Sequence, residues 1–260
     1  MHAKFLFLGT GGSLGVPVVG CHCHVCRSLS PLNKRLRPSG LLTIGEKSFL
    51  IDVGPDFREQ AIRYGINDIT GLWITHTHYD HIGGLDEVRV FHVLHRKRLP
   101  CLCSKETFDE IHHRFHYLFR KRSGEECSQM DFTFLPSDFG QIVFEGVPIE
   151  YLTYYQAGMK VTGFRVGSFA YISDIRKYEE KVLEALKGVD ILVLSALRYT
   201  LSEVHFTLDE AIDFGRKVGA KRVFFTHIAH EIEHEETSAK LPSGHTLAHD
   251  GLEIEFQLEI

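Results

Sequence analysis

The chain has 260 residues, of which 43% are hydrophobic and 24% are charged, and its formal net charge is −5. These proportions are ordinary for a globular protein. They exclude a disordered or fibrous chain, and the acidic balance argues against a protein that coats nucleic acid. No apolar run reaches the roughly 18 residues of a transmembrane helix. The first residues lack the features of a signal peptide. We therefore expect a cytoplasmic protein that does not enter a membrane.

Strands and helices alternate along the chain, as judged from apolar periodicity and from glycine and proline punctuation. The predicted strands are residues 4–8, 41–44, 48–52, 71–75, three short segments within 131–153, and then 161–166, 169–172, 190–194, 222–226 and 252–258. The predicted helices are residues 108–122, 179–186 and 208–218, and Thr207 is the expected N-cap of the last. No repeat or low-complexity linker interrupts the chain. We expect one domain, residues 1–260, with two mixed sheets, helices outside them and polar motifs just after strands.

The clearest chemical motif is the sequence THTHYDH at residues 75–81, directly after the predicted strand 71–75. His76 and His78 alternate where the strand ends, so both can point to one side. Asp80 and His81 can turn back from the following loop toward a second ion. Imidazole and carboxylate ligands together suit zinc, manganese or iron. A single histidine here would indicate a solvated loop, but four potential ligands within six residues indicate a metal site.

Three cysteines, Cys21, Cys23 and Cys26, crowd into six positions near the N-terminus. Clustered thiols in a chain without a signal peptide fit a metal site better than a disulfide scaffold. Three thiolates need a fourth ligand to close a tetrahedral structural zinc site, which we place in an N-terminal zinc-binding loop, residues 20–27. Buried free thiols are the alternative. Cys101 and Cys103 lie in an apolar segment and are expected in the core.

The histidine motif, together with Gly83 and Gly84, resembles the metallo-β-lactamase superfamily, and the resemblance covers nearly the whole chain. The segments that are similar to its PhnP-type branch, the cyclic-phosphate phosphodiesterases, are residues 9–12, 20–26, 35–39, 173–174, 205, 226–230 and 241–244. This resemblance implies an α+β protein with a four-layer αββα fold and two metal ions in the cleft between its sheets.

The resemblance also implies roles for particular residues. The implied ligands are His76 and His78 for the first ion, Asp80, His81 and His227 for the second, and Asp174 as a bridge between the two. Two divalent ions, manganese or zinc, can activate a shared water to hydroxide and neutralise the phosphoryl oxygens. Taken without the other ligands, Asp174 would be read as a turn cap.

His205 matches an additional active-site histidine, which would bind the phosphate or protonate the leaving oxygen, and we count it with Asp80 as catalytic. A histidine without a task near a helix N-terminus is the alternative for His205. His230 is the implied fourth ligand of the structural zinc, with Cys21, Cys23 and Cys26.

One position departs from the family pattern. The family supplies a third histidine to the first ion, and counting back seven residues from Gly163 reaches Gln156. No histidine occurs between His116 and His205. A glutamine can ligate through its carbonyl oxygen, but it is neutral, so the first site should be weaker and favour manganese or magnesium. Three possibilities follow: an altered two-ion site, one ion held by the second set of ligands and Asp174, or a catalytically weak metal-binding protein.

The resemblance indicates a small or cyclic phosphodiester as the substrate, attacked by a metal-activated hydroxide. An RNA-processing nuclease similar to tRNase Z is the alternative. The basic segments 95–98 and 120–122 bracket the helix 108–122, whose histidines and Arg114 can contact RNA phosphates, although a solvated helix face is the commoner outcome. Arg35 and Arg37 are expected to bind anions or carboxylates at the cleft, or to make structural pairs. A homodimer is expected from the resemblance.

Overall fold

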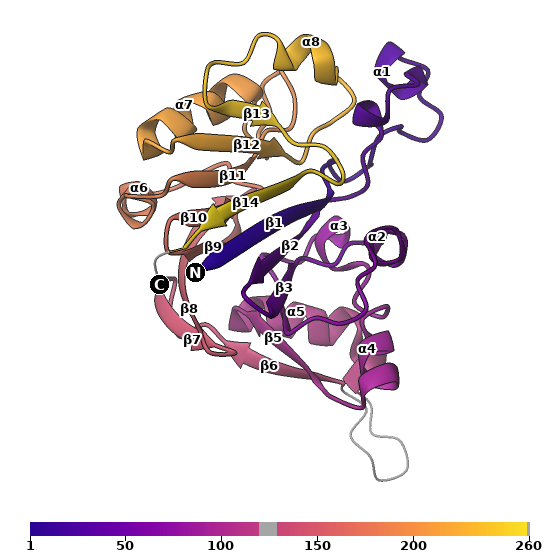
Figure 1. The fold of residues 1–260 in the computed structure, drawn as a ribbon, viewed down its shortest axis with the longest axis vertical. Coiled ribbons are helices and arrows are strands. Elements are labelled where there is room, and N and C mark those ends of the chain that lie inside the picture. Colours follow the sequence, from indigo (N-terminus) through magenta and orange to yellow (C-terminus); the bar gives the residue numbers. More distant parts are fainter. Residues whose placement is uncertain (120–128, 259–260) are drawn as a thin grey trace.

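The computed structural model describes residues 1–119 and 129–258 and arranges them around two seven-stranded sheets (Figure 1). The first sheet has the strand order β14-β1-β2-β3-β4-β5-β6. Its strands are β1 (His2–Gly9), β2 (Ser39–Ile44), β3 (Lys47–Ile51), β4 (Gly71–Trp73), β5 (Leu99–Cys103), β6 (Met130–Phe134) and β14 (Glu253–Gln257). Neighbours from β14 to β3 are antiparallel, and those from β3 to β6 are parallel.

The second sheet repeats this division, with the strand order β13-β12-β11-β10-β9-β8-β7. Its strands are β7 (Phe139–Phe144), β8 (Val147–Gln156), β9 (Met159–Val166), β10 (Phe169–Ile172), β11 (Ile191–Ser195), β12 (Arg222–Thr226) and β13 (His245–Leu247). Neighbours from β7 to β10 are antiparallel, and those from β10 to β13 are parallel. Ligands commonly bind beyond the carboxyl ends of parallel strands, which both sheets contain.

Most of the longer helices cover the outer faces of the two sheets. The helices are α1 (His24–Arg27), α2 (Phe57–Tyr64), α3 (Tyr79–Ile82), α4 (Arg89–His95), α5 (Lys105–Arg114), α6 (Glu180–Ala185), α7 (Leu208–Val218) and α8 (His234–Ser238), with short 3₁₀ turns at Pro31–Asn33 and His116–Phe119. Within the described residues, no helix has the length and apolar character to cross a membrane.

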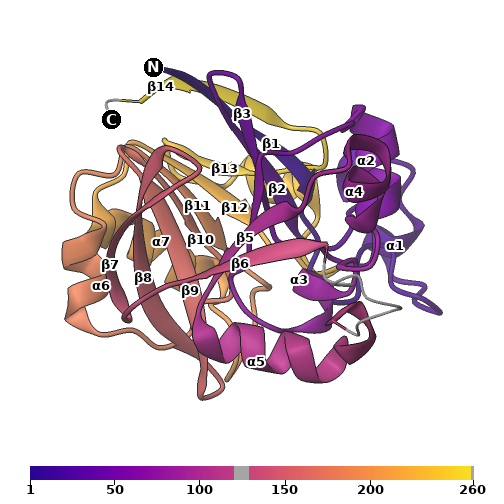
Figure 2. The ribbon, with the colours of Figure 1, turned by 90° about the horizontal axis from the view of Figure 1, so that it is seen from below.

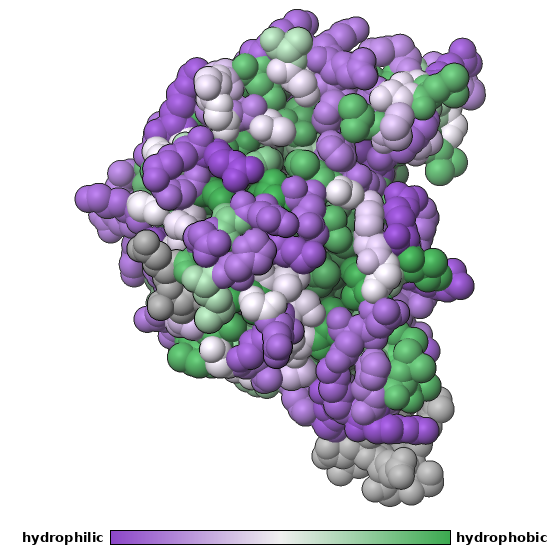
Figure 3. All heavy atoms as spheres, viewed as in Figure 1, coloured by the Kyte–Doolittle hydropathy of each residue, from purple (hydrophilic) through white to green (hydrophobic). Residues whose placement is uncertain are grey.

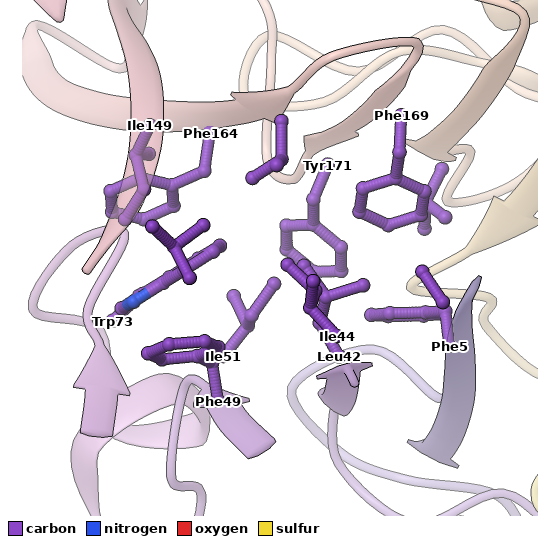
Figure 4. Packing of buried hydrophobic residues seen from close by; sticks show 14 of the residues in the cluster. Phe5, Leu42, Ile44, Phe49, Ile51, Trp73, Ile149, Phe164, Phe169 and Tyr171 are labelled. Carbon is purple, nitrogen blue, oxygen red and sulfur yellow. The ribbon is translucent and has the colours of Figure 1, made fainter. Parts of the chain in front are cut away.

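Three apolar clusters join these layers. The largest lies between the sheets, where Phe49 and Trp73 of the first sheet face Phe164 of the second (Figure 4). A second cluster packs α6 and α7 against the second sheet, and a third packs α2, α4 and α5 against the first sheet. Figure 2 shows the two sheets on opposite sides of the molecule. The structure therefore confirms the expected four-layer αββα arrangement of an α+β protein.

Most predicted elements lie close to their expected bounds. Helix α7 and strand β12 have the predicted bounds, and the Thr207 hydroxyl accepts from the Glu210 N–H in a capping box. The predicted helix 108–122 was wrong at both ends: α5 begins at Lys105 and ends at Arg114, where the chain changes to a 3₁₀ turn. Residues 120–122 lie outside the described part. Helices α2 and α4 were not predicted.

Some hydrophobic side chains remain on the surface. In Figure 3 some lie at the upper right, where Figure 1 places α1 and its flanking loops, and others lie lower on the right, near α4. In these loops, Val19 is 98% exposed and Leu29 is 97% exposed. Exposed apolar groups of this kind occur at protein interfaces. The expected homodimer stays a prediction.

Candidate metal centre

The polar residues predicted for the site come together at strand ends. They follow β4 (His76, His78, and Asp80 and His81 in α3), end β8 (Gln156), follow β10 (Asp174) and follow β12 (His227). Every one of these side chains is buried except that of His78, which is half-buried. Three residues of the site that follow strands have left-handed backbones: Asp52 with φ 60°, Asp174 with φ 54° and His227 with φ 59°. This conformation turns the chain sharply, and it is uncommon outside Gly, Asn, Asp and His.

Four side chains, Asp80, His81, Asp174 and His227, form what we call the second ligand set. His227 Nε2 lies 3.2 Å from Asp80 Oδ2 and 3.2 Å from Asp174 Oδ1. His81 Nε2 lies 3.6 Å from Asp80 Oδ2 and 3.5 Å from Asp174 Oδ2. Ligand atoms that each lie about 2.1 Å from one ion are separated by about 3.0–3.5 Å in tetrahedral or octahedral geometry. This set therefore fits a single divalent cation.

His76, His78 and Asp174 form the first ligand set, in which each residue offers an atom within 4.8 Å of the others. His76 Nε2 lies 3.5 Å from Asp174 Oδ2. The Nε2 atoms of His76 and His81 are both buried, and neither has a hydrogen-bond partner among the described residues. Buried nitrogen atoms without partners are costly unless something else binds them. A metal ion would satisfy both, so the residues present fit the ions that the fold implies.

Asp52, at the end of β3, holds two of these histidines in place. Its Oδ2 lies 2.7 Å from His81 Nδ1 and accepts from the Thr75 hydroxyl at 2.8 Å. The same hydroxyl lies 2.9 Å from His76 Nδ1 and accepts from it, because its own proton goes to Asp52. Both Nδ1 atoms are thereby protonated, which leaves each Nε2 atom as the one that can bind an ion. Such outer partners orient metal ligands.

Sequence reasoning missed Asp52, although a signal was present. Asp52 follows a buried strand, as Asp174 does, and both occupy left-handed backbones at the site. A search for carboxylates at the ends of all predicted strands would have found it.

Gln156 lies where the family pattern places its third histidine, buried beside Asp174. Its Nε2 donates to Asp174 Oδ2 at 3.1 Å and lies 3.0 Å from His205 Nε2. Its Oε1 is buried and has no partner among the described residues. The amide thus contacts the carboxylate that both ligand sets share. Whether Gln156 binds an ion stays a prediction.

Charge is balanced within the centre. Burial opposes ionisation of Asp174, but His227 and His81 outweigh this effect and hold the pKa of that carboxyl well below its usual range. Burial lowers the pKa of His205 to about 4, even though Asp174 raises it. The imidazole is therefore neutral near pH 7.

A separate cluster, called here the cysteine cluster, joins the loop before α1 to the loop after β12. His230 Nδ1 lies 3.2 Å from Cys21 Sγ, 3.5 Å from Cys23 Sγ and 3.4 Å from Cys26 Sγ. Zinc bonds of about 2.3 Å to sulfur and 2.0 Å to nitrogen give separations of about 3.5 Å in a tetrahedron. A hydrogen bond from the Cys26 N–H lowers the pKa of the Cys23 thiol to about 6, which favours the thiolate. These four residues fit a closed structural zinc site.

The two arginines expected near the cleft make structural pairs instead. Arg35 is buried and donates to Thr10 Oγ1 at 2.7 Å and to the Ala248 carbonyl at 2.6 Å. Arg37 pairs with Asp56 at 2.7 Å. Neither is available to bind an anion at the centre.

The basic segments considered for RNA binding are largely neutralised. Lys97 pairs with Asp68, and Arg98 pairs with Asp131. Arg114 pairs with Glu110 at 2.6 Å and also donates to the Thr77 carbonyl in the motif loop. The described part of this face therefore supports the solvated-helix interpretation. The segment 120–122 lies outside the described residues.

Three comparisons place the chain among known proteins. Residues 47–228 match the beta-lactamase superfamily domain. The chain is 34% identical over 253 residues to an octanoyltransferase of Porphyromonas gingivalis (strain ATCC BAA-308 / W83), covering 96% of this chain and 51% of that protein. The chain thus spans about half the length of this curated relative.

Two solved structures have the same fold. A new diphosphatase from the PhnP family is 39% identical with a TM-score of 0.92, and the match covers 100% of this chain and 99% of the other. Human tRNase Z, short form, is 18% identical with a TM-score of 0.70 over 99% of this chain and 100% of the other, which shows the fold alone. Because the domain match spans most of the chain and the two-sheet fold agrees with it, the chain belongs to the metallo-β-lactamase superfamily.

Proposed function

We propose that this protein is a metal-dependent hydrolase that cleaves phosphodiester bonds in small or cyclic molecules. The observation that carries the proposal is the pair of ligand sets sharing Asp174, in which the Nε2 atoms of His76 and His81 are buried without partners. The 39% identity to a PhnP-family diphosphatase supports the same class of chemistry. In hydrolysis, water adds across one P–O bond, giving a phosphomonoester and an alcohol.

The two ligand sets would hold the ions, with Gln156 beside the first. Two divalent ions in such a site activate water and neutralise the phosphoryl oxygens. The chain's own residues orient the site. Asp52 fixes the tautomers of His76 and His81. His205 lies 3.9 Å from Asp174 Oδ2 and faces a pocket of about 230 Å³, where it can contact the group that leaves.

A second candidate is hydrolysis of a diphosphate, in which the bond cleaved joins two phosphoryl groups. The name of the PhnP-family relative favours it. The octanoyltransferase does not support acyl transfer here, because its name describes a chain about twice as long. The pairing of Lys97 and Arg98 with carboxylates argues against RNA. The structural zinc at the cysteine cluster is part of the proposal.

The test is turnover by the full chain reloaded with manganese or zinc after chelation. Substrates are bis(4-nitrophenyl) phosphate, adenosine 2′,3′-cyclic phosphate and a dinucleoside diphosphate. The control is Asp174→Asn, which removes the charge shared by both ligand sets while keeping the shape. We expect metal-dependent cleavage of at least one diester and loss of at least about 100-fold in the control. Cleavage of the diphosphate alone would support the second candidate. No turnover with either metal would mean a metal-binding protein without this activity.

A further inference from the structure

Arg114, the last residue of α5, reaches out of its helix to the loop that carries the metal ligands. Its Nη1 donates to the Thr77 carbonyl at 2.7 Å, and its Nε donates to Glu110 Oε1 at 2.6 Å. Glu110 lies one turn earlier in α5, so the ion pair helps to direct the guanidinium. Figure 2 shows α5 ending near α3, the short helix that follows this loop. A helix outside both ligand sets is thus joined to the backbone between two ligands.

The Thr77 carbonyl belongs to the peptide unit that joins Thr77 to His78. A peptide unit is planar, so a hydrogen bond that fixes this carbonyl also fixes the direction in which the backbone enters His78. A bond from a guanidinium is charge-assisted and therefore stronger than one between neutral groups. On the other side, the His78 carbonyl accepts from the N–H groups of His81 and Ile82 at 3.0 and 3.1 Å. The backbone of His78 is held by Arg114 before it and by α3 after it.

The imidazole of His78 lacks the support that the other two histidines of the motif have. The Nδ1 atoms of His76 and His81 each have a hydrogen-bond partner. The His78 ring is half-buried and makes no hydrogen bond to any residue that the structure describes. Outer partners usually orient a ligating histidine. For His78 the backbone must do this, and the bond from Arg114 to the preceding carbonyl takes that role.

The first ligand set depends strongly on His78, because Gln156 stands where the family pattern has a third histidine. The set consists of His76, His78 and Asp174, so it offers two imidazoles. The Gln156 Nε2 donates to Asp174 instead of offering a lone pair. The second ligand set does not include His78. A displaced His78 would therefore weaken the binding of one ion and leave that of the other.

We propose that Arg114 is a positioning residue for His78 and thereby sets the affinity of the first ligand set for its ion. This inference rests on the proposed function, in which that set holds an ion, and it adds a residue of α5 to the groups that control the site. The charge of Arg114 acts in the opposite direction. A positive charge opposes the binding of a nearby cation, so loss of the charge alone would strengthen the site. Weaker binding after its loss identifies positioning rather than charge.

The first experiment titrates the chelated full chain with manganese and measures the free ion by electron paramagnetic resonance. We expect two binding steps in the wild type, the weaker one at the first ligand set. Arg114→Gln should weaken that step about tenfold and leave the tighter step within about threefold, since loss of an outer partner costs about 10–100-fold at the ligand it supports. Arg114→Lys, which keeps a donor and the charge, should recover much of the loss.

The matched control is Arg63→Gln. Arg63 also pairs with a carboxylate four residues earlier in its helix, Glu59, and its side chain has the same 44% exposure as that of Arg114. This control should bind manganese as the wild type does. An unchanged or tighter weak step in Arg114→Gln, an equal loss in Arg63→Gln, or a wild type that binds a single ion in the cleft would overturn the inference.

A second measurement observes the histidines themselves, by nuclear magnetic resonance of the chelated protein with ¹⁵N-labelled imidazoles. The His78 signals are assigned by their absence in His78→Gln. In Arg114→Gln these signals should shift or broaden, while those of His76 and His81 stay in place. Unchanged His78 signals, or equal changes at all three histidines, would contradict a positioning role. Melting temperatures within a few degrees of wild type confirm that the variants fold. Neither measurement uses turnover, so this inference and the hydrolase proposal can fail separately.

Discussion

Replacing Asp52 with asparagine should weaken metal binding without disturbing the fold. Asparagine has nearly the same shape and, like aspartate, tolerates the left-handed backbone at this position, where φ is 60°. Its Oδ1 can still accept from the Thr75 N–H, as Asp52 Oδ1 does at 2.8 Å. Its NH₂ group, however, would face His81 Nδ1, now 2.7 Å from Oδ2. Two donors cannot share that contact, so His81 must move its proton to Nε2, the atom that binds the ion.

The expected loss of metal affinity follows from the two histidines that Asp52 orients. Loss of an outer hydrogen-bond partner reduces metal affinity by about 10–100-fold, or about 1.4–2.7 kcal/mol. Asp52 contacts His81 directly and acts on His76 only through the Thr75 hydroxyl. We therefore expect a loss of about 100-fold at the second ligand set and about tenfold at the first.

The assay is a titration of the chelated protein with zinc against a competing indicator at pH 7. A matched control is Asp56→Asn, because Asp56 pairs with Arg37 and lies outside both ligand sets. The control should bind metal as wild type does. Zinc affinities of Asp52→Asn within about threefold of wild type would refute the view that this carboxylate sets the tautomers of the ligands.

Three other changes test separate parts of the structure. Gln156→His should add a ligand to the first set and raise the metal content measured by plasma mass spectrometry. An unchanged number of metal ions per chain would show that the cleft excludes a further ion. Cys26→Ser should remove one zinc and lower the melting temperature by at least about 5 °C. Metal binding at a closed site contributes to folding, and 1 kcal/mol corresponds to about 2–4 °C in a domain of this size. A variant that retains all its zinc would contradict a structural zinc site at the cysteine cluster. Burial and Arg35 lower the pKa of His234 from 6.5 to about 4. The neutral imidazole contributes fully to stability above pH 6.5. As the pH falls from 6.5 toward 4, the unfolded chain takes up a proton that the folded one does not, so stability is lost. His234→Gln, which can still accept from Arg35, should therefore show a shallower fall in unfolding free energy over that window, by up to about 3 kcal/mol; equal slopes would rule out this role.

Elements with local signals could be predicted from the sequence. Helix α7 combines an apolar stripe, the Thr207 capping box and Gly219 in a left-handed C-cap, so all the information lies within the segment itself. Helices α2 and α4 were missed because each is short, at eight and seven residues, and buries few residues, Phe57 and Gln60 in α2 and Phe91 in α4. Their stability comes from Phe57 and Phe91, which pack against the first sheet.

The site shows the same division between local and distant information. The motif at residues 75–81 carries four of its ligands in one loop, so spacing alone indicated them. The role of Asp52 depends on His81, 29 residues away in sequence, and the neutralisation of Lys97 depends on Asp68, also 29 residues away. Composition counts charges but does not show which of them pair. The low pKa of His205 likewise comes from burial that only the assembled sheets create.

The left-handed backbones at Asp52, Asp174 and His227 have a consequence for how this protein can change. Each costs about 1–2 kcal/mol relative to a glycine at the same position, so the three together take up a sizeable part of the 5–15 kcal/mol that keeps a typical domain folded. Replacing these residues with glycine would relieve that strain, but at Asp52 it would also leave the buried Thr75 N–H and hydroxyl without their acceptors. Glycine at these positions would thus relieve strain and lose contacts at once, so the gain in stability is smaller than the backbone strain alone suggests.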